Sequence, residues 1–146
     1  MSRRLLWRQQ AGFTLIELLI VTVIIAVLAA VAIPNLFQSI RRSKNARAAS
    51  ESRHIVANTL LYIDDNKAVP GVNTYNTLYD GTAPGGTRYM GRASDPWNKL
   101  NDFSFATNGT TGEVQVWSIG QAGVGATFRQ QGTVGYSSMS GEYDQN

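Results

Sequence analysis

The sequence predicts an α+β protein in which one long N-terminal helix carries a small antiparallel β-sheet on its C-terminal half. Two observations support this fold class. Residues 13–66 contain no glycine and a single proline, Pro34, which is typical of one continuous helix. Farther along the chain, two short runs of alternating apolar and polar residues flank an Asn-Gly pair, and this pattern predicts a β-hairpin.

The first part of the predicted helix is apolar enough to cross a membrane. Residues 18–40 carry no charged side chain, and residues 18–33 are apolar except for Thr22. A helix of about 20 apolar residues spans the hydrocarbon core of a bilayer. Pro34 removes a backbone donor and crowds the preceding turn, so we expect a kink or local unwinding of the helix there. The whole helix would be roughly 80 Å long at 1.5 Å per residue.

The second part of the predicted helix is amphipathic. Apolar residues recur every seven positions and predict a narrow stripe that packs against a small domain; the stripe consists of Ala49, Val56 and Ile63, with Arg53 and Leu60 beside them. A coiled-coil partner would use the same stripe, although packing within the chain is favoured. Two aspartates, an asparagine and then Pro70 end the helix.

The remaining residues predict a small globular part. Glycine and proline are frequent in residues 71–95, so this region is expected to be a loop. Strands are expected at residues 102–106 and 113–118, with Val114, Val116 and Ser118 on one face and Gln115 and Trp117 on the other.

The tail from residue 120 is rich in Gly, Ser and Gln, which predicts partial order, with one short strand near residues 135–136. Trp97 and Trp117 are expected to anchor the core.

The net charge of the chain comes from three arginines at its start. The chain has 13 basic and 10 acidic residues. Removing Arg3, Arg4 and Arg8 leaves 10 against 10, so the overall basicity is no argument for nucleic-acid binding. With no cysteine, disulfides and thiolate metal sites are excluded.

Glu17 is the most informative residue, because it is a lone carboxylate at the edge of the apolar segment. Burying it in lipid is costly, so a partner is expected; the alternative is that Glu17 lies at headgroup level and reaches water. A cleaved secretory signal places its small residue after the apolar stretch, whereas Gly12 precedes it.

The spacing of Gly12, Phe13, Glu17 and Pro34 resembles the class III signal of type IV pilins and type II secretion pseudopilins. The resemblance implies a prepilin peptidase that cuts between Gly12 and Phe13 and methylates the new amine of Phe13, giving N-methylphenylalanine. It also implies a leader over residues 1–12, a transmembrane and filament-core helix over 13–36, its amphipathic continuation over 37–68, and a periplasmic β-containing domain with a flexible tail over 69–146. The chain would cross the bacterial inner membrane once, with its N-terminus cytoplasmic.

The second half resembles the major pseudopilin of type II secretion in three places: Asp95 to Asn98, Phe103 to Phe105, and Val116 to Gly120. In that family, acidic residues after the corresponding glycine help to bind calcium, but residues 121–126 of this chain include none. Calcium prefers carboxylate ligands, so we expect no cofactor. A weak calcium site built from backbone carbonyls with Glu142 or Asp144 remains the alternative.

The resemblance implies a structural subunit that polymerises into a type II secretion pseudopilus, which drives protein export across the outer membrane. Its expected partners are copies of itself, minor pilins, the prepilin peptidase, membrane lipid, and an inner-membrane assembly platform with a cytoplasmic ATPase. Within the filament, Glu17 of one subunit would pair with the Phe13 amine of its neighbour. The alternatives are a type IV pilin for adhesion, twitching motility or DNA uptake, a membrane-anchored periplasmic domain, and an unrecognised enzyme.

Other polar residues give weaker indications. Arg41, Arg42, Lys44 and Arg47 follow the apolar segment, which is opposite to the positive-inside tendency. They are expected to contact phospholipid headgroups or acids of neighbouring subunits, with DNA phosphates as the alternative. His54 is the single histidine and is expected on a helix surface, and Ser118 has no evident catalytic partners. No enzyme activity is therefore expected.

Overall fold

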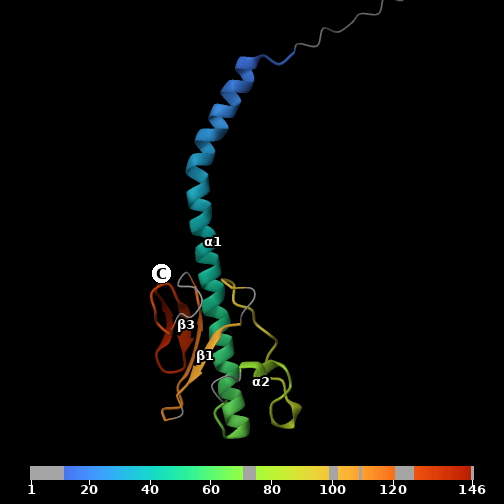
Figure 1. Cartoon of the computed structure of the whole chain (residues 1–146), viewed down its shortest axis with the longest axis vertical. Helices are drawn as coiled ribbons and strands as arrows, with labels where there is room; N and C mark the ends of the chain where they lie inside the picture. The colour runs from blue at the N-terminus through green and yellow to red at the C-terminus, as the bar shows by residue number, and fades with distance from the viewer. Residues whose placement is uncertain (1–11, 71–74, 99–101, 109, 121–126, 146) are drawn as a thin grey trace, which may run out of the picture. The chain divides into compact units, whose positions relative to one another are not determined.

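The computed structural model describes residues 12–70, 75–98, 102–108, 110–120 and 127–145. The chain divides into two compact units, Met1–Ser39 and Ile40–Asn146. Most of the predicted leader and residues 121–126 lie outside the described residues, as does Gly109 of the predicted hairpin turn. Helix α1 (Leu15–Asn66) runs through both units and has Pro34 inside it (Figure 1). The prediction of one long helix ending near residue 66 is confirmed.

In the first unit, the side chains of α1 are exposed. Every large apolar side chain from Leu15 to Phe37 is at least 46% exposed, the lowest value being that of Val21. Thr22 donates its hydroxyl to the Leu19 carbonyl oxygen at 2.9 Å, so the polar side chain that interrupts residues 18–33 is satisfied by its own helix. Among the described residues, no other part of the protein covers this apolar surface, as expected of a segment that contacts lipid or other helices.

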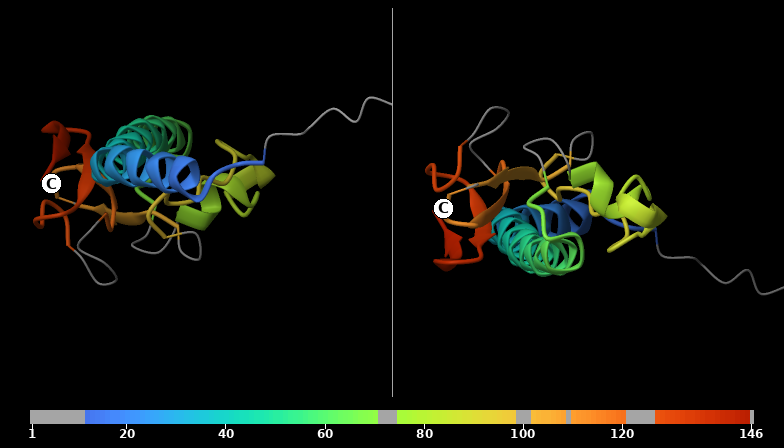
Figure 2. Two further views of the ribbon diagram at one scale, coloured as in Figure 1. Left: turned by 90° about the horizontal axis from the view of Figure 1, so that it is seen from above. Right: turned by 90° about the horizontal axis from the view of Figure 1, so that it is seen from below.

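The second unit is a four-stranded antiparallel sheet packed on α1. Its strands are β1 (Ser104–Thr107), β2 (Val114–Ser118), β3 (Val134–Ser137) and β4 (Gly141–Asp144), and they pair in the order β1-β2-β3-β4. Figure 2 shows the sheet and the short helix α2 (Tyr75–Tyr79) on one side of α1, while the opposite side of α1 stays uncovered. The predicted α+β fold is confirmed.

The predicted amphipathic stripe is confirmed at Ala49 and Val56 but is broader than expected. The buried residues of α1 are Ala48, Ala49, Ser52, Ile55, Val56, Thr59 and Tyr62. These positions follow a spacing of three and four residues, which is the helical period. Leu60 is 45% exposed, so its expected place beside the stripe is wrong: it lies one position beyond Thr59, on the uncovered side of α1.

The first hairpin forms as predicted. In β2, Val114, Val116 and Ser118 are buried, and Gln115 and Trp117 between them are half-buried. Asn108 donates its backbone N–H to the Glu113 carbonyl oxygen, at 2.8 Å. The tryptophan prediction is wrong: Trp97 and Trp117 are only half-buried, and the core is built from smaller side chains such as Ile55, Leu78 and Val116.

Two other expectations are corrected by the structure. The region predicted as loop contains α2 and the 3₁₀ turn η1 (Pro84–Gly86), because Leu78 of α2 is fully buried in the core and holds that helical turn in place. In the tail, the short strand expected near residues 135–136 is confirmed as β3, but the expectation of partial order is wrong for residues 141–144, which form β4 and complete the sheet.

Gly135 in β3 helps to explain why the tail pairs with β2. Its Cα lies opposite Trp117, and a Cβ atom built on it would come 2.4 Å from the Val116 carbonyl oxygen. The glycine therefore lets two strands approach more closely than a side chain would permit. On the far side of the hairpin, Arg53 of α1 pairs with Glu142 of β4, and Asn45 donates to Asp144 at 3.2 Å.

Candidate functional site

The start of α1 is organised around Thr14 and Glu17. The backbone N–H and the hydroxyl of Thr14 both donate to Glu17 Oε2, at 3.0 and 2.7 Å. In return, the backbone N–H of Glu17 donates to the Thr14 hydroxyl oxygen at 3.3 Å. This reciprocal arrangement is a capping box, which satisfies N–H groups that a helix start leaves without partners. Glu17 therefore has a role within its own chain.

Sequence reasoning missed Thr14, although the signal was present. A Thr followed three residues later by Glu, just before an apolar run, is the sequence pattern of a capping box. Thr14 fixes where the helix begins, and it directs the Glu17 carboxylate toward the residues that precede the helix. The predicted pairing of Glu17 with an amine at Phe13 stays a prediction, and so does the kink at Pro34.

Gly12 and Phe13 precede the helix and are exposed, with Phe13 at 77%. No atom lies within 4 Å of a Cβ built on Gly12. Packing within the chain thus does not require a glycine at this position. An exposed, non-helical pair of residues is accessible to other proteins. The predicted cleavage between Gly12 and Phe13 stays a prediction.

The apolar segment fits a membrane span by length and composition. Among the described residues, α1 is the one helix long and apolar enough to cross a bilayer, and none of its most apolar stretch is buried within the protein. Apart from Glu17, no charged residue occurs in residues 13–40. The two functional features predicted from the sequence, a lone acid and a long apolar helix, are thus next to each other at the start of α1.

In the globular unit, Asp95 connects two of the segments that resemble the major pseudopilin, residues 95–98 and 116–120. Its side chain is almost fully buried, with 1% exposed. Asp95 Oδ1 accepts from the Ser118 hydroxyl at 2.6 Å and from the Trp97 N–H at 2.8 Å, and Oδ2 accepts from the Ile119 N–H at 3.1 Å. A buried carboxylate is tolerated only with such donors. Asp95 therefore fastens the turn at residues 95–98 to the end of β2.

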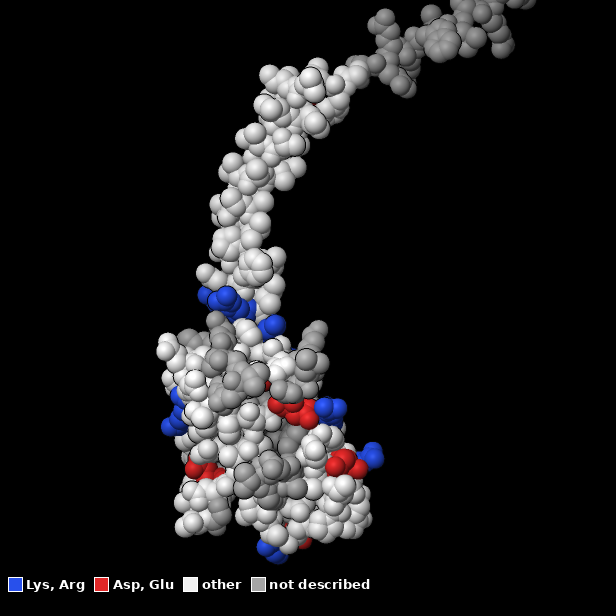
Figure 3. Space-filling view, in the orientation of Figure 1, with Lys and Arg blue, Asp and Glu red and all other residues white. Residues whose placement is uncertain are grey.

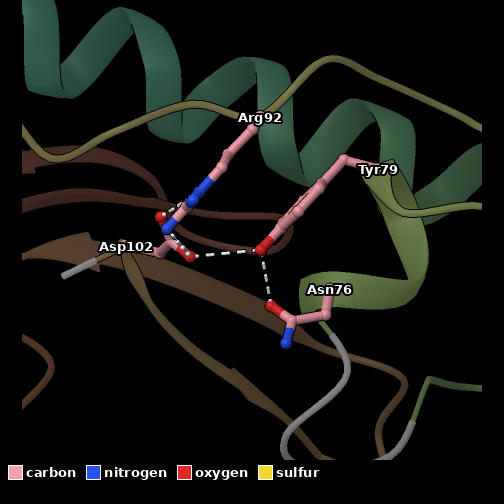
Figure 4. Close-up of polar contacts among 4 residues, drawn as sticks. All are labelled: Asn76, Tyr79, Arg92 and Asp102. Atoms are coloured by element: carbon pink, nitrogen blue, oxygen red, sulfur yellow. Dashed lines mark hydrogen bonds and ion pairs between the residues drawn. The ribbon is translucent and has the colours of Figure 1, made fainter.

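A second polar cluster fastens α2 to the start of β1 (Figure 4). Arg92 donates through Nε to Asp102 Oδ1 at 3.0 Å, and the Tyr79 hydroxyl lies 3.2 Å from Asp102 Oδ2 and 2.8 Å from Asn76 Oδ1. Burial of the ring raises the pKa of Tyr79, and the neighbouring Asp102 charge adds to the effect. All four groups are used by one another, which is the pattern of a structural tie.

No catalytic arrangement forms around the polar residues singled out in the sequence. His54 is exposed on α1, and the Ser118 hydroxyl is buried and occupied by Asp95. Within the described parts of the chain, no three His, Cys, Asp or Glu side chains lie close enough to hold a metal ion. Glu142 and Asp144, the acids considered for a weak calcium site, contact Arg53 and Asn45 of α1, and the absence of a cofactor stays a prediction.

Comparison with known proteins identifies the family. Residues 7–33 match the family model described as the prokaryotic N-terminal methylation motif. The type II secretion system core protein G of Vibrio cholerae is 29% identical over 124 residues, which cover 80% of this chain and 84% of that protein. The corresponding protein of Pseudomonas aeruginosa is 30% identical over 125 residues, which cover 80% of this chain and 87% of that protein. The chain belongs to the type II secretion system core protein G family.

This membership confirms the predicted resemblance to the major pseudopilins. The match to the methylation motif covers Gly12, Phe13 and Glu17, and the similarity to the core G proteins extends over most of the globular unit. A similar protein of Klebsiella michiganensis is 28% identical over 129 residues, covering 82% of this chain and 89% of that protein. No solved structure gives a significant match. The core G family consists of structural pseudopilins, which agrees with the expectation of a non-enzyme.

Proposed function

We propose that this pseudopilin polymerises into the pseudopilus of a type II secretion system, a filament that drives protein export across the outer membrane. Similarity to core G proteins over four fifths of the chain supports this function. The structure supports it through an exposed apolar helix joined to a small folded unit. In such a subunit, the helix supplies cohesion by packing against its copies, while the folded unit lies at the filament surface.

The maturation step is proposed to act on residues 12 and 13. A prepilin peptidase would cut between Gly12 and Phe13 and methylate the new amine. The exposed, non-helical conformation at these residues and the absence of any packing demand for Gly12 support this assignment. The chain would then cross the inner membrane once, with its N-terminus cytoplasmic and the globular unit in the periplasm.

The observation that carries the mechanism is the position of the lone acid. Glu17 is the only charged residue in residues 13–40. The two hydrogen bonds that its carboxylate accepts from Thr14 both end on Oε2. A carboxylate has about four acceptor positions, so Oε1 can accept from an ammonium group while the capping box stays intact. The Phe13 amine of a neighbouring subunit would supply that ammonium group, and the pair would set the register between subunits.

The remaining partners follow from this function. Assembly would require minor pilins and an inner-membrane platform driven by a cytoplasmic ATPase, and membrane lipid would surround the helix before assembly. Nucleic acid is not proposed as a partner. The protein is proposed to need no calcium, because no carboxylate lies between Glu113 and Glu142, and the acids of β4 are engaged by α1.

The test is the substitution Glu17→Val, with Thr22→Val as the matched control in the same segment. Removing one member of a buried ion pair costs about 3–5 kcal/mol, enough to abolish assembly. Glu17→Val should therefore keep a mature chain that begins at Phe13, measured by mass spectrometry, but form no filaments in electron micrographs. Thr22→Val should give both the mature chain and the filaments, because the Thr22 hydroxyl donates to the Leu19 carbonyl oxygen of its own helix. Normal filaments from Glu17→Val would contradict the pairing, and a mature chain beginning elsewhere would contradict the maturation step.

A further inference from the structure

Four basic side chains surround α1 just after its uncharged segment, and we name Arg41, Arg42, Lys44 and Arg47 the basic collar. At 3.6 residues per turn, they project at about 0°, 100°, 300° and 240° around the helix axis. A surface for one protein partner normally occupies one face of a helix. The basic collar instead directs positive charge to nearly every side, which suits a layer that encircles the helix.

The basic collar lies before the packed part of α1. Arg41, Arg42 and Arg47 are exposed and Lys44 is half-buried, whereas Ala48 and Ala49 are the first buried residues of the helix. Figure 3 shows basic side chains gathered on this part of α1, next to the globular part. The pair between Arg47 and Glu51 is long, at 3.9 Å, and its arginine is 61% exposed, so it competes weakly with another anion.

A hollow of about 390 Å³ opens on the basic collar and is lined by Ser43, Lys44, Arg47, Ser94, Asp95 and Pro96. Two cations and two hydroxyl groups there can donate to the oxygens of a phosphate. Asp95 does not oppose an anion strongly, because its carboxylate is 1% exposed and already accepts from Ser118, Trp97 and Ile119. The donors in the hollow thus suit an anionic phosphate group.

Trp97 lies beside the same hollow. Its indole N–H donates to Asn45 Oδ1 at 3.1 Å, and Lys44 Nζ lies 4.9 Å from the ring centroid. The ring is only half-buried. Tryptophan is enriched at the level of lipid headgroups, where one part of the ring is apolar and the other bonds to polar groups. Trp97 and the basic collar therefore carry two independent features of a membrane interface.

The length of the uncharged segment places the basic collar at that level. Residues 18–40 would span about 35 Å as a helix, slightly more than the roughly 30 Å hydrocarbon core. The next residues of the chain are those of the basic collar. In the orientation proposed above, they would meet the headgroups of the periplasmic leaflet, and their charge, unfavourable by the positive-inside tendency, would need an anionic lipid.

We infer that the basic collar and its hollow bind the phosphate of an anionic phospholipid such as phosphatidylglycerol, and that this contact holds the unassembled subunit at a fixed depth. The inference rests on the membrane anchoring of the proposed function but not on leader cleavage or polymerisation. Each cation near an anionic surface contributes about fivefold to association. Losing Lys44 and Arg47 together should therefore reduce the lipid preference by about 25-fold.

The experiment uses Trp97 as the reporter in the full-length chain. Trp7→Phe and Trp117→Phe leave Trp97 as the only tryptophan, and circular dichroism checks that the chain stays folded. The protein is reconstituted in phosphatidylcholine vesicles that contain brominated phosphatidylglycerol or brominated phosphatidylcholine at equal mole fraction. Phosphatidylglycerol should quench Trp97 more strongly. Lys44→Gln with Arg47→Gln should remove the difference, whereas Lys44→Arg with Arg47→Lys should keep it.

The control is Lys67→Gln, which removes one positive charge beyond the end of α1 and should leave the quenching unchanged. Equal quenching by the two lipids, or a preference that survives the double glutamine variant, overturns the inference. A third result would also overturn the inference. In it, the parent shows no lipid preference, and the double glutamine variant loses cross-linking between subunits in neutral vesicles. That result would assign the basic collar to acids of a neighbouring subunit.

Discussion

Replacing Asp95 by alanine tests whether one buried carboxylate holds the globular unit together. Three donors lose their acceptor in Asp95→Ala: the Ser118 hydroxyl and the backbone N–H groups of Trp97 and Ile119. A buried donor left without a partner costs about 1–3 kcal/mol. Ser118 is fully buried, while Trp97 and Ile119 are half-buried, so water can reach the last two, and a total of about 3–4 kcal/mol is expected.

That loss is large for a unit of this size. For a domain of 60–100 residues, 1 kcal/mol lowers the unfolding temperature by about 4–8 °C, so Asp95→Ala should lower it by at least 10 °C or so. The assay is thermal unfolding of the full-length protein in detergent, followed by circular dichroism. The unfolding temperature of Asp95→Asn should lie between those of the parent protein and Asp95→Ala. Its amide oxygen can still accept from Ser118 and Trp97, whereas its NH₂ group would face the Ile119 donor.

The control for this prediction is Asp64→Asn, whose side chain is 80% exposed and whose loss should cost less than about 0.5 kcal/mol. If Asp95→Ala unfolds at the same temperature as Asp64→Asn, the carboxylate does not hold the loop, and the reasoning fails. A double-mutant cycle with Ser118→Ala would separate the hydroxyl contribution from that of the backbone donors.

Three further outcomes are expected. Gly135→Ala should destabilise the globular unit by about 1–3 kcal/mol in urea unfolding, because its Cβ would lie 2.4 Å from the Val116 carbonyl oxygen, whereas Gly91→Ala meets no atom within 4 Å; equal costs would refute the close approach. Burial raises the pKa of Tyr143, so the unfolded chain loses this proton first and stability should fall as the pH rises above about 10; Tyr143→Phe should reduce that fall, and an unchanged pH profile would contradict it. Adding calcium or a chelator should leave the unfolding temperature unchanged, since a ligand stabilises only the state that binds it; a rise with calcium would show that the chain has a site.

The helix and the first hairpin could be predicted because their signals are local. Residues 13–66 lack helix breakers except for Pro34, and the observed helix is Leu15–Asn66. In β2, the alternation of Val114 and Val116 with more polar residues matches the burial of the strand. Glu17 stood out because it is the single charged residue in residues 13–40, while the assembly roles of Gly12, Phe13 and Glu17 stay predictions. The capping role of Thr14 was not predicted, although its spacing from Glu17 is a local signal.

Only one strand of the second hairpin could be predicted, near residues 135–136, because the stabilising contacts of this hairpin come from distant parts of the chain. Residues 134–144 contain glycine, serine and tyrosine without a clear apolar alternation. They form strands because β2 offers an edge for pairing, and because Val134, Ser137 and Tyr143 become buried there. The same holds for α2, where burial of Leu78 outweighs the weak helix propensity of the surrounding loop.

The sequence by itself determined that a lone acid, Glu17, lies in the first turn of a long apolar helix, because such a pattern depends only on residue type and spacing along one helix. Only the tertiary structure decided that Asp95 is a buried acceptor, that the tryptophans stay outside the buried core, and that the acids of β4 bind α1. Those roles depend on which donors the folded chain brings within about 3 Å of each group, and such proximity leaves no local pattern in the sequence.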